Sequence, residues 1–121
     1  MLAEFPSSKP PQILLKILEI AKKTMRLKPN ARLHFIKRVD LRKHFPNLTH
    51  VGSIGEADYE NQIAYVCESD DGIATTCSTL VHELLHLKDE AHKCHYEGDN
   101  FYEETRYWER EIFKTLSFSV N

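Results

Sequence analysis

The chain has 121 residues, of which 41% are hydrophobic and 28% charged, and its formal net charge is −2. This length suits one domain with a modest core, so we expect residues 1–121 to form a single domain of a soluble globular protein. No apolar run approaches a membrane span, and Met1 to Pro6 lacks the basic and apolar segments of a signal peptide. These absences predict a cytoplasmic protein without a membrane partner.

Charge is distributed unevenly along the chain. Residues 1–50 carry 11 Lys and Arg against 3 Asp and Glu, whereas residues 51–121 carry 5 against 15. Packing of the two halves against each other would cancel much of this field. The alternative is a basic surface for nucleic acid around Lys37-Arg38 and Arg42-Lys43-His44. No aromatic-and-glycine pattern of a nucleic-acid module accompanies these charges, so the first interpretation is favoured.

The first predicted element is a helix. Residues 1–9 are typical of a poorly ordered leader, and Pro10-Pro11 opens a helix of about 16 residues. Its apolar stripe recurs at helical spacing and consists of Ile13, Leu14, Ile17, Leu18, Ala21 and Met25. Pro29-Asn30 ends the helix. The stripe predicts that this helix packs against the rest of the domain.

Three strand candidates follow. Residues 32–39 alternate between apolar and polar as a half-buried strand does. After a loop or short helical segment through Phe45-Pro46, residues 49–55 and 62–67 are two further candidates. The polar segment 56–61 between them predicts a hairpin.

Two helices complete the predicted fold. The apolar residues of the segment 73–87 recur at helical spacing after a turn at Asp71-Gly72. A last helix is predicted from about Phe101 to Phe118, after a break at Gly98-Asp99-Asn100. The order of helix, strands, helix and helix predicts a small α+β domain with a twisted sheet of three or slightly more strands.

The residues His82-Glu83-Leu84-Leu85-His86 carry the clearest functional signal. Positions i and i+4 of a helix share a face, so both imidazoles can reach one metal ion. Glu83, at the edge of that face, can act as a general base. A short motif can arise by chance, but ionisable groups within an apolar helix need a partner such as a metal. We therefore predict that His82 and His86 bind Zn2+.

This motif resembles the HExxH of the zincin metallopeptidases, and the resemblance covers roughly residues 31–112. It implies a zincin-like domain in which a small twisted sheet lies over the motif helix. It also implies that a rim strand of the sheet binds an extended substrate by antiparallel strand addition. In this chain the strand 63–67 would bind the peptide or protein substrate in that way.

A catalytic zinc takes three protein ligands and keeps one position for water, so one more ligand is needed. Glu104 lies 18 residues past His86 and resembles the glutamate that a separate helix supplies in gluzincins. Asn100 can cap this helix and Glu103 can complete a capping box, which leaves Glu104 free at the border of the apolar face. Glu109 is a weaker alternative on the other flank of that face.

His92 is the main alternative as third ligand. The spacing of His82, His86 and His92 is that of metzincins. Those proteins have glycine where this chain has Asp89, because the helix turns there in a left-handed conformation. Both methionines of the chain lie upstream of the motif, so the methionine turn of metzincins is not evident. We favour Glu104 and keep His92 as the alternative.

The cysteines add a weaker candidate. Cys67, Cys77 and Cys94 form no CxxC pair, which predicts reduced thiols in an intracellular protein. Cys94 lies near the motif and could act as a soft ligand, although a solvent-facing thiol is the favoured interpretation.

The small size and the last helix, rich in Tyr, Trp and Glu, look most like the minigluzincins and more distantly like ImmA/IrrE-type peptidases. The resemblance implies a zinc-dependent endopeptidase that hydrolyses extended or unfolded polypeptides, with a metal-activated water and Glu83 as general base. A donor for the oxyanion should come from outside the motif helix, and Tyr107 is the candidate.

Two further hypotheses concern latency and an alternative function. A cleft on so small a domain has few subsites, so either chain terminus could occupy it and keep the enzyme latent. The alternative function is a regulatory binding protein with a structural zinc and a basic N-terminal surface for nucleic acid or a protein partner. An intact Glu83 argues against this alternative, because a structural site has no need for a base.

Overall fold

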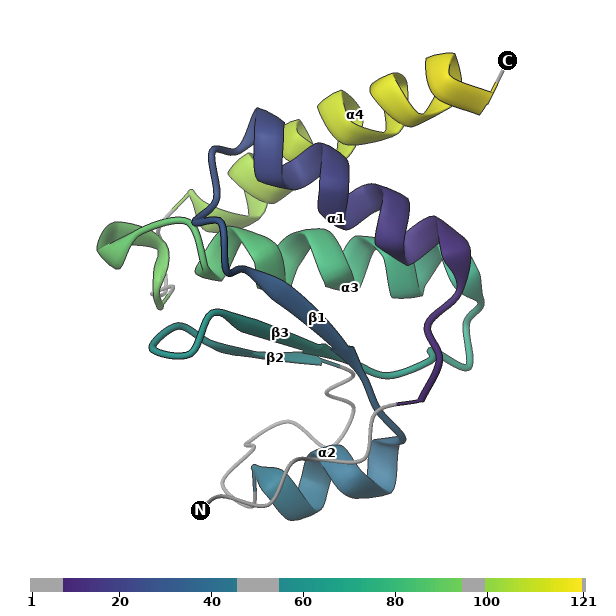
Figure 1. Ribbon diagram of the computed structural model, residues 1–121, viewed down its shortest axis with the longest axis vertical. Coiled ribbons are helices and arrows are strands. Elements are labelled where there is room, and N and C mark those ends of the chain that lie inside the picture. The colour runs from purple at the N-terminus through teal and green to yellow at the C-terminus, as the bar shows by residue number, and fades with distance from the viewer. Residues whose placement is uncertain (1–7, 46–54, 95–99, 121) are drawn as a thin grey trace.

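Helices and strands follow one another as expected of a small α+β domain. The computed structural model describes residues 8–45, 55–94 and 100–120. Within these ranges the elements are α1 (Gln12–Thr24), β1 (Arg32–Phe35), α2 (Arg38–His44), β2 (Gly55–Asp58), β3 (Ile63–Val66), α3 (Ile73–His86), the 3-10 helix η1 (Glu90–His92) and α4 (Phe101–Val120) (Figure 1). The predicted class and the predicted three-stranded sheet are confirmed.

β3 is the central strand of the sheet. The strand order is β1-β3-β2, with β1 parallel and β2 antiparallel to β3. Every residue of β3 is buried, because its sequence Ile-Ala-Tyr-Val supplies apolar side chains to both faces. Both hydrogen-bonding edges of β3 are already used by its neighbours β1 and β2. The prediction that strand 63–67 binds a peptide substrate by strand addition is therefore wrong.

Three helices cover one face of the sheet, and α2 lies on the other side (Figure 1). α1, α3 and α4 pack against one another, and α3 contacts both β2 and β3. The main core lies between these helices and the sheet and includes Leu14, Ile17, Ala64, Val66, Leu80, Leu84 and Ile112. A smaller cluster consists of Ile36, Leu41, Ile63, Tyr65 and Cys67. Successive residues of β3 thus contribute to opposite faces, as the period of a strand requires.

The first strand is shorter than predicted. The alternation of residues 32–39 suggested one strand, but β1 ends at Phe35 and α2 begins at Arg38. Leu41 and Phe45, four residues apart on α2 and at its end, pack on the smaller cluster. This helical spacing competes with the strand pattern, and burial of both side chains favours the helix.

β2 begins at the last residue of the predicted strand 49–55 and continues into the segment predicted to be a connection. Residues 56–61 were expected to join two strands, whereas β2 spans Gly55–Asp58 and forms the hairpin with β3. Residues 49–54 of the predicted strand lie outside the described residues. The residues of β2 are Gly, Glu, Ala and Asp, all half-buried, so this strand has no apolar alternation to reveal it.

The terminal segments differ from expectation. α1 has 13 residues, with Pro11 at its N-cap. Residues 1–7 of the predicted leader lie outside the described residues, and the backbone N–H of Ser8 donates to the carbonyl of Phe35 at 2.7 Å. α4 continues to Val120, two residues beyond the predicted end at Phe118. Occupation of a cleft by either chain terminus stays a prediction. In the described ranges, no helix combines the length and apolarity that crossing a bilayer requires.

Candidate metal centre

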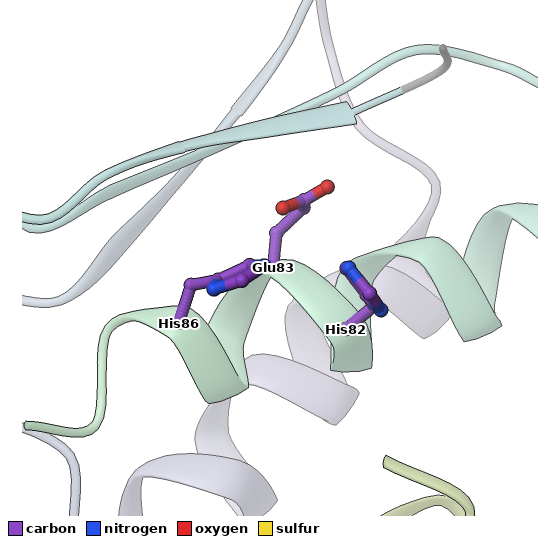
Figure 2. A group of neighbouring side chains, drawn as sticks. All are labelled: His82, Glu83 and His86. Atoms are coloured by element: carbon purple, nitrogen blue, oxygen red, sulfur yellow. The ribbon is translucent and has the colours of Figure 1, made fainter. Parts of the chain in front are cut away.

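α3 carries the three motif residues close together. Figure 2 shows His82, Glu83 and His86 together on this helix, with the Glu83 carboxylate directed toward the sheet. Each side chain offers one ligand atom, and these atoms lie within 4.8 Å of one another. Among residues 8–45, 55–94 and 100–120, these three side chains form the group of His, Cys, Asp or Glu that could hold a metal ion.

His86 is held in the orientation that a metal ligand needs. Its Nδ1 lies 2.8 Å from the carbonyl oxygen of His92. Because a carbonyl only accepts hydrogen bonds, Nδ1 carries the hydrogen, which in a neutral ring is the tautomer that binds a metal through Nε2. The Phe101 ring stacks on His86 with centroids 4.3 Å apart and lies 4.9 Å from the His82 ring. The first residue of α4 therefore packs against both imidazoles.

Glu83 is buried, with 7% of its surface exposed. Burial raises the pKa of Glu83 well above its ordinary value, and the nearby charge of Glu56 raises it further. Burial also raises the pKa of Glu56, which lies on β2. A carboxylate with a raised pKa is a stronger proton acceptor near neutral pH.

This burial should reduce the stability of the zinc-free protein at neutral pH. The native state binds the Glu83 proton more tightly than the unfolded state does. The free energy of unfolding therefore falls as the pH rises from the ordinary value of 4.5 toward the raised pKa. We expect zinc-free Glu83→Gln to be more stable than the zinc-free wild type at neutral pH. The difference should shrink as the pH falls toward 4.5, which urea unfolding across a pH series would measure. The same difference at every pH would contradict this expectation.

β2 approaches α3 so closely that position 55 has room only for glycine. A Cβ on Gly55 would lie 2.7 Å from Cγ2 of Thr79 and 2.8 Å from Oε2 of Glu83. Both separations are well below van der Waals contact, and Thr79 belongs to the helix turn before Glu83. The missing side chain of Gly55 thus lets the sheet lie directly over the Glu83 carboxylate.

Replacing Gly55 with alanine should destabilise the protein and displace Glu83. Overpacking of this kind costs about 1–3 kcal/mol, which urea unfolding would measure. Thr79→Ser is the matched background, because it removes Cγ2 but keeps the hydroxyl that donates to the Thr75 carbonyl. Gly55→Ala should cost less in that background. An equal cost in both backgrounds would show that the close contact with Thr79 is not the cause.

The two candidates for third ligand contact each other. Nε2 of His92 lies 2.8 Å from Oε2 of Glu104, and Nδ1 of His92 lies 2.6 Å from Oδ1 of Asp89. Neither candidate belongs to the group within 4.8 Å. Asp89 has an extended backbone, with a φ of −164°, so the left-handed turn of metzincins is not formed at this position. These contacts favour Glu104, and the third ligand stays a prediction.

Two aromatic residues next to the motif, Phe101 and Tyr102, were not anticipated, and the role of Tyr107 as oxyanion donor stays a prediction. Tyr107 is 46% exposed, and its ring packs edge-on against Trp108 with centroids 5.0 Å apart. The ring of Tyr102 instead lies 5.5 Å from that of His82. Phe101 and Tyr102 open the helix that carries Glu104, so their place in the sequence could have indicated them. Cys94 is exposed, as the favoured interpretation expected.

Comparison of the chain with protein-family models, with curated proteins and with solved structures finds no match. The resemblance of the motif to zincins therefore remains a prediction.

Proposed function

We propose that the chain is a zinc-dependent endopeptidase that hydrolyses extended or unfolded polypeptides. The observation that supports this most directly is the group of His82, Glu83 and His86 within 4.8 Å, with Glu83 buried. A structural zinc site has no use for a buried carboxylate that is not a ligand. Hydrolysis, in contrast, needs a general base at this place.

The donor set suits zinc. Imidazole nitrogens and carboxylate oxygens are the usual ligands of catalytic zinc, and the His92 carbonyl already fixes the tautomer of His86. In the proposal His82 and His86 bind the ion and Glu104 is the third ligand. The bound ion would polarise the peptide carbonyl and activate a water molecule.

Glu83 moves the proton in this proposal. It takes a proton from the attacking water and gives it to the leaving amine. The raised pKa of Glu83 suits both steps, because a carboxyl whose pKa is closer to neutrality both accepts and releases a proton readily. Gly55 keeps the backbone of β2 close to this carboxylate, so a substrate beside β2 would lie within its reach.

The substrate is proposed to bind along β2. In the described part of the chain β2 pairs only with β3, which leaves its other edge to receive an extended peptide. Glu56 and Asp58 belong to this strand and supply two acidic side chains. Peptides with basic residues next to the cleaved bond should therefore be preferred.

Casein, an unstructured protein, provides the test. The zinc-loaded chain should cut casein, a chelator should stop the reaction, and added zinc should restore it. Fragments are followed by gel electrophoresis and zinc by mass spectrometry. A chain that retains zinc but cuts neither casein nor a basic unfolded polypeptide would contradict the proposal. Binding of the same preparation to an oligonucleotide would then favour the regulatory binding protein.

A further inference from the structure

Three side chains beside the motif form a continuous hydrogen-bonded chain, of which the proposed reaction uses only Glu104. Asp89 contacts Nδ1 of His92 at 2.6 Å, and Nε2 of His92 contacts Glu104 at 2.8 Å. The His92 side chain is 20% exposed and that of Glu104 33% exposed. The contacts join η1 to α4, which are separated in sequence by residues outside the described ranges. These contacts therefore join α4 to the segment that follows α3.

Asp89 fixes both the ring and the backbone of His92. Its Oδ1 accepts from the backbone N–H of His92 at 3.1 Å as well as facing the ring at 2.6 Å. Burial alone would raise the pKa of Asp89, but the hydrogen bonds and charge of His92 outweigh it and lower this pKa. One carboxylate thus sets the orientation of the imidazole relative to η1.

His92 in turn contacts two of the candidate zinc ligands, His86 and Glu104. Its carbonyl oxygen lies 2.8 Å from Nδ1 of His86, while its ring holds Oε2 of Glu104. Phe101, three residues before Glu104 on the same helix, stacks on His86. His92 therefore joins His86 to Glu104, and Phe101 of the same helix as Glu104 packs on His86.

We propose that His92 is a positioning residue that presents Glu104 and His86 to the zinc and is not itself a ligand. This inference rests on the proposed function. Both ring nitrogens of His92 face a carboxylate oxygen, so neither is left for a metal. A carboxylate has two oxygens, and the contact of Oε2 with His92 leaves Oε1 of Glu104 for the ion. Outer partners of this kind orient the ligands of a metal and tune its affinity.

Zinc affinity of the full chain, measured by competition with a chromophoric chelator, tests the inference. Asp89→Asn keeps an oxygen for the backbone N–H of His92 and removes the charge that faces the ring. We expect Asp89→Asn and His92→Gln each to weaken zinc binding by about 10–100-fold. Glu90→Gln is the matched control: the same loss of charge on the neighbouring, exposed residue of η1 should leave the affinity unchanged.

A double-mutant comparison separates positioning from a general effect on folding. In the Glu104→Ala background, His92→Gln should lower the zinc affinity by a smaller factor than in the wild type, because the ligand that the His92 ring positions is gone. An equal loss in both backgrounds would mean that His92 supports only the fold, and would overturn the inference. Circular dichroism checks that each variant folds. If His92→Gln does not fold, Asp89→Asn is compared in the same two backgrounds.

The remaining outcomes separate the inference from the proposed function. A wild-type chain that binds no zinc overturns both. Wild-type binding with unchanged affinity in Asp89→Asn and His92→Gln overturns the inference and leaves the proposed function standing. A loss in His92→Gln as large as that in His82→Ala, with Glu104→Ala unchanged, would make His92 the third ligand and also overturn the inference.

Discussion

Replacing Glu83 with glutamine should lower the rate of casein hydrolysis by about 10²–10⁴-fold and leave the bound zinc in place. Glutamine has nearly the same size and shape, so the buried position under β2 still accommodates it. It cannot accept the proton of the attacking water. The rate of cleavage and the zinc content of the same preparation measure the two effects together.

Glu103→Gln is the matched control for this variant. Glu103 lies on α4 in the turn that also contains Glu104, is exposed, and loses the same charge. Its hydrolysis rate and zinc content should equal those of the wild type. Cleavage by Glu83→Gln at the wild-type rate would exclude Glu83 as the base. Loss of zinc from Glu83→Gln would instead show that Glu83 is itself a ligand.

The second large effect concerns His86. His86→Ala should weaken zinc binding beyond the roughly 100-fold that the loss of an outer partner causes, because a ligand is removed. Zinc at a free concentration of 100 times its Kd stabilises the wild-type chain by about 2.7 kcal/mol. We expect this gain to vanish in His86→Ala. Chelator competition measures the affinity, and thermal unfolding with and without zinc measures the stabilisation.

His34→Ala is the control for a lost histidine. His34 lies on β1 with its ring 5.4 Å from that of Tyr65, whose side chain belongs to the cluster on the α2 side of the sheet. Zinc should stabilise His34→Ala as much as it stabilises the wild type. Full zinc stabilisation of His86→Ala, or its loss in His34→Ala, would place the metal away from α3.

The motif helix was predictable because its apolar residues and its histidines follow the same helical period. Leu80, Leu84 and Leu85 recur at helical spacing, and His82 and His86 share that period, so the helix and the pair of imidazoles follow from the same pattern. The break before Phe101 and the apolar face likewise predicted the helix α4, whereas Glu104 as third ligand stays a prediction. These features depend on local geometry, which the sequence expresses directly.

What could not be predicted depends on contacts between distant segments. β2 has no apolar alternation, and its place over Glu83 depends on Gly55 meeting Thr79 from another element. Glu104 and His92 looked like competing ligands because each fits a spacing rule. Their contact at 2.8 Å shows that they can act as partners, and no spacing rule contains that information.

We propose that His82 and His86 bind a zinc ion whose other ligands are oxygen atoms. X-ray absorption spectroscopy of the zinc-loaded full chain measures these ligands. We expect two imidazole nitrogens at about 2.0–2.1 Å and the remaining ligands as oxygen at about 2.0–2.2 Å. A sulfur neighbour at about 2.3 Å, which would implicate a cysteine such as Cys94, or fewer than two imidazoles would contradict it.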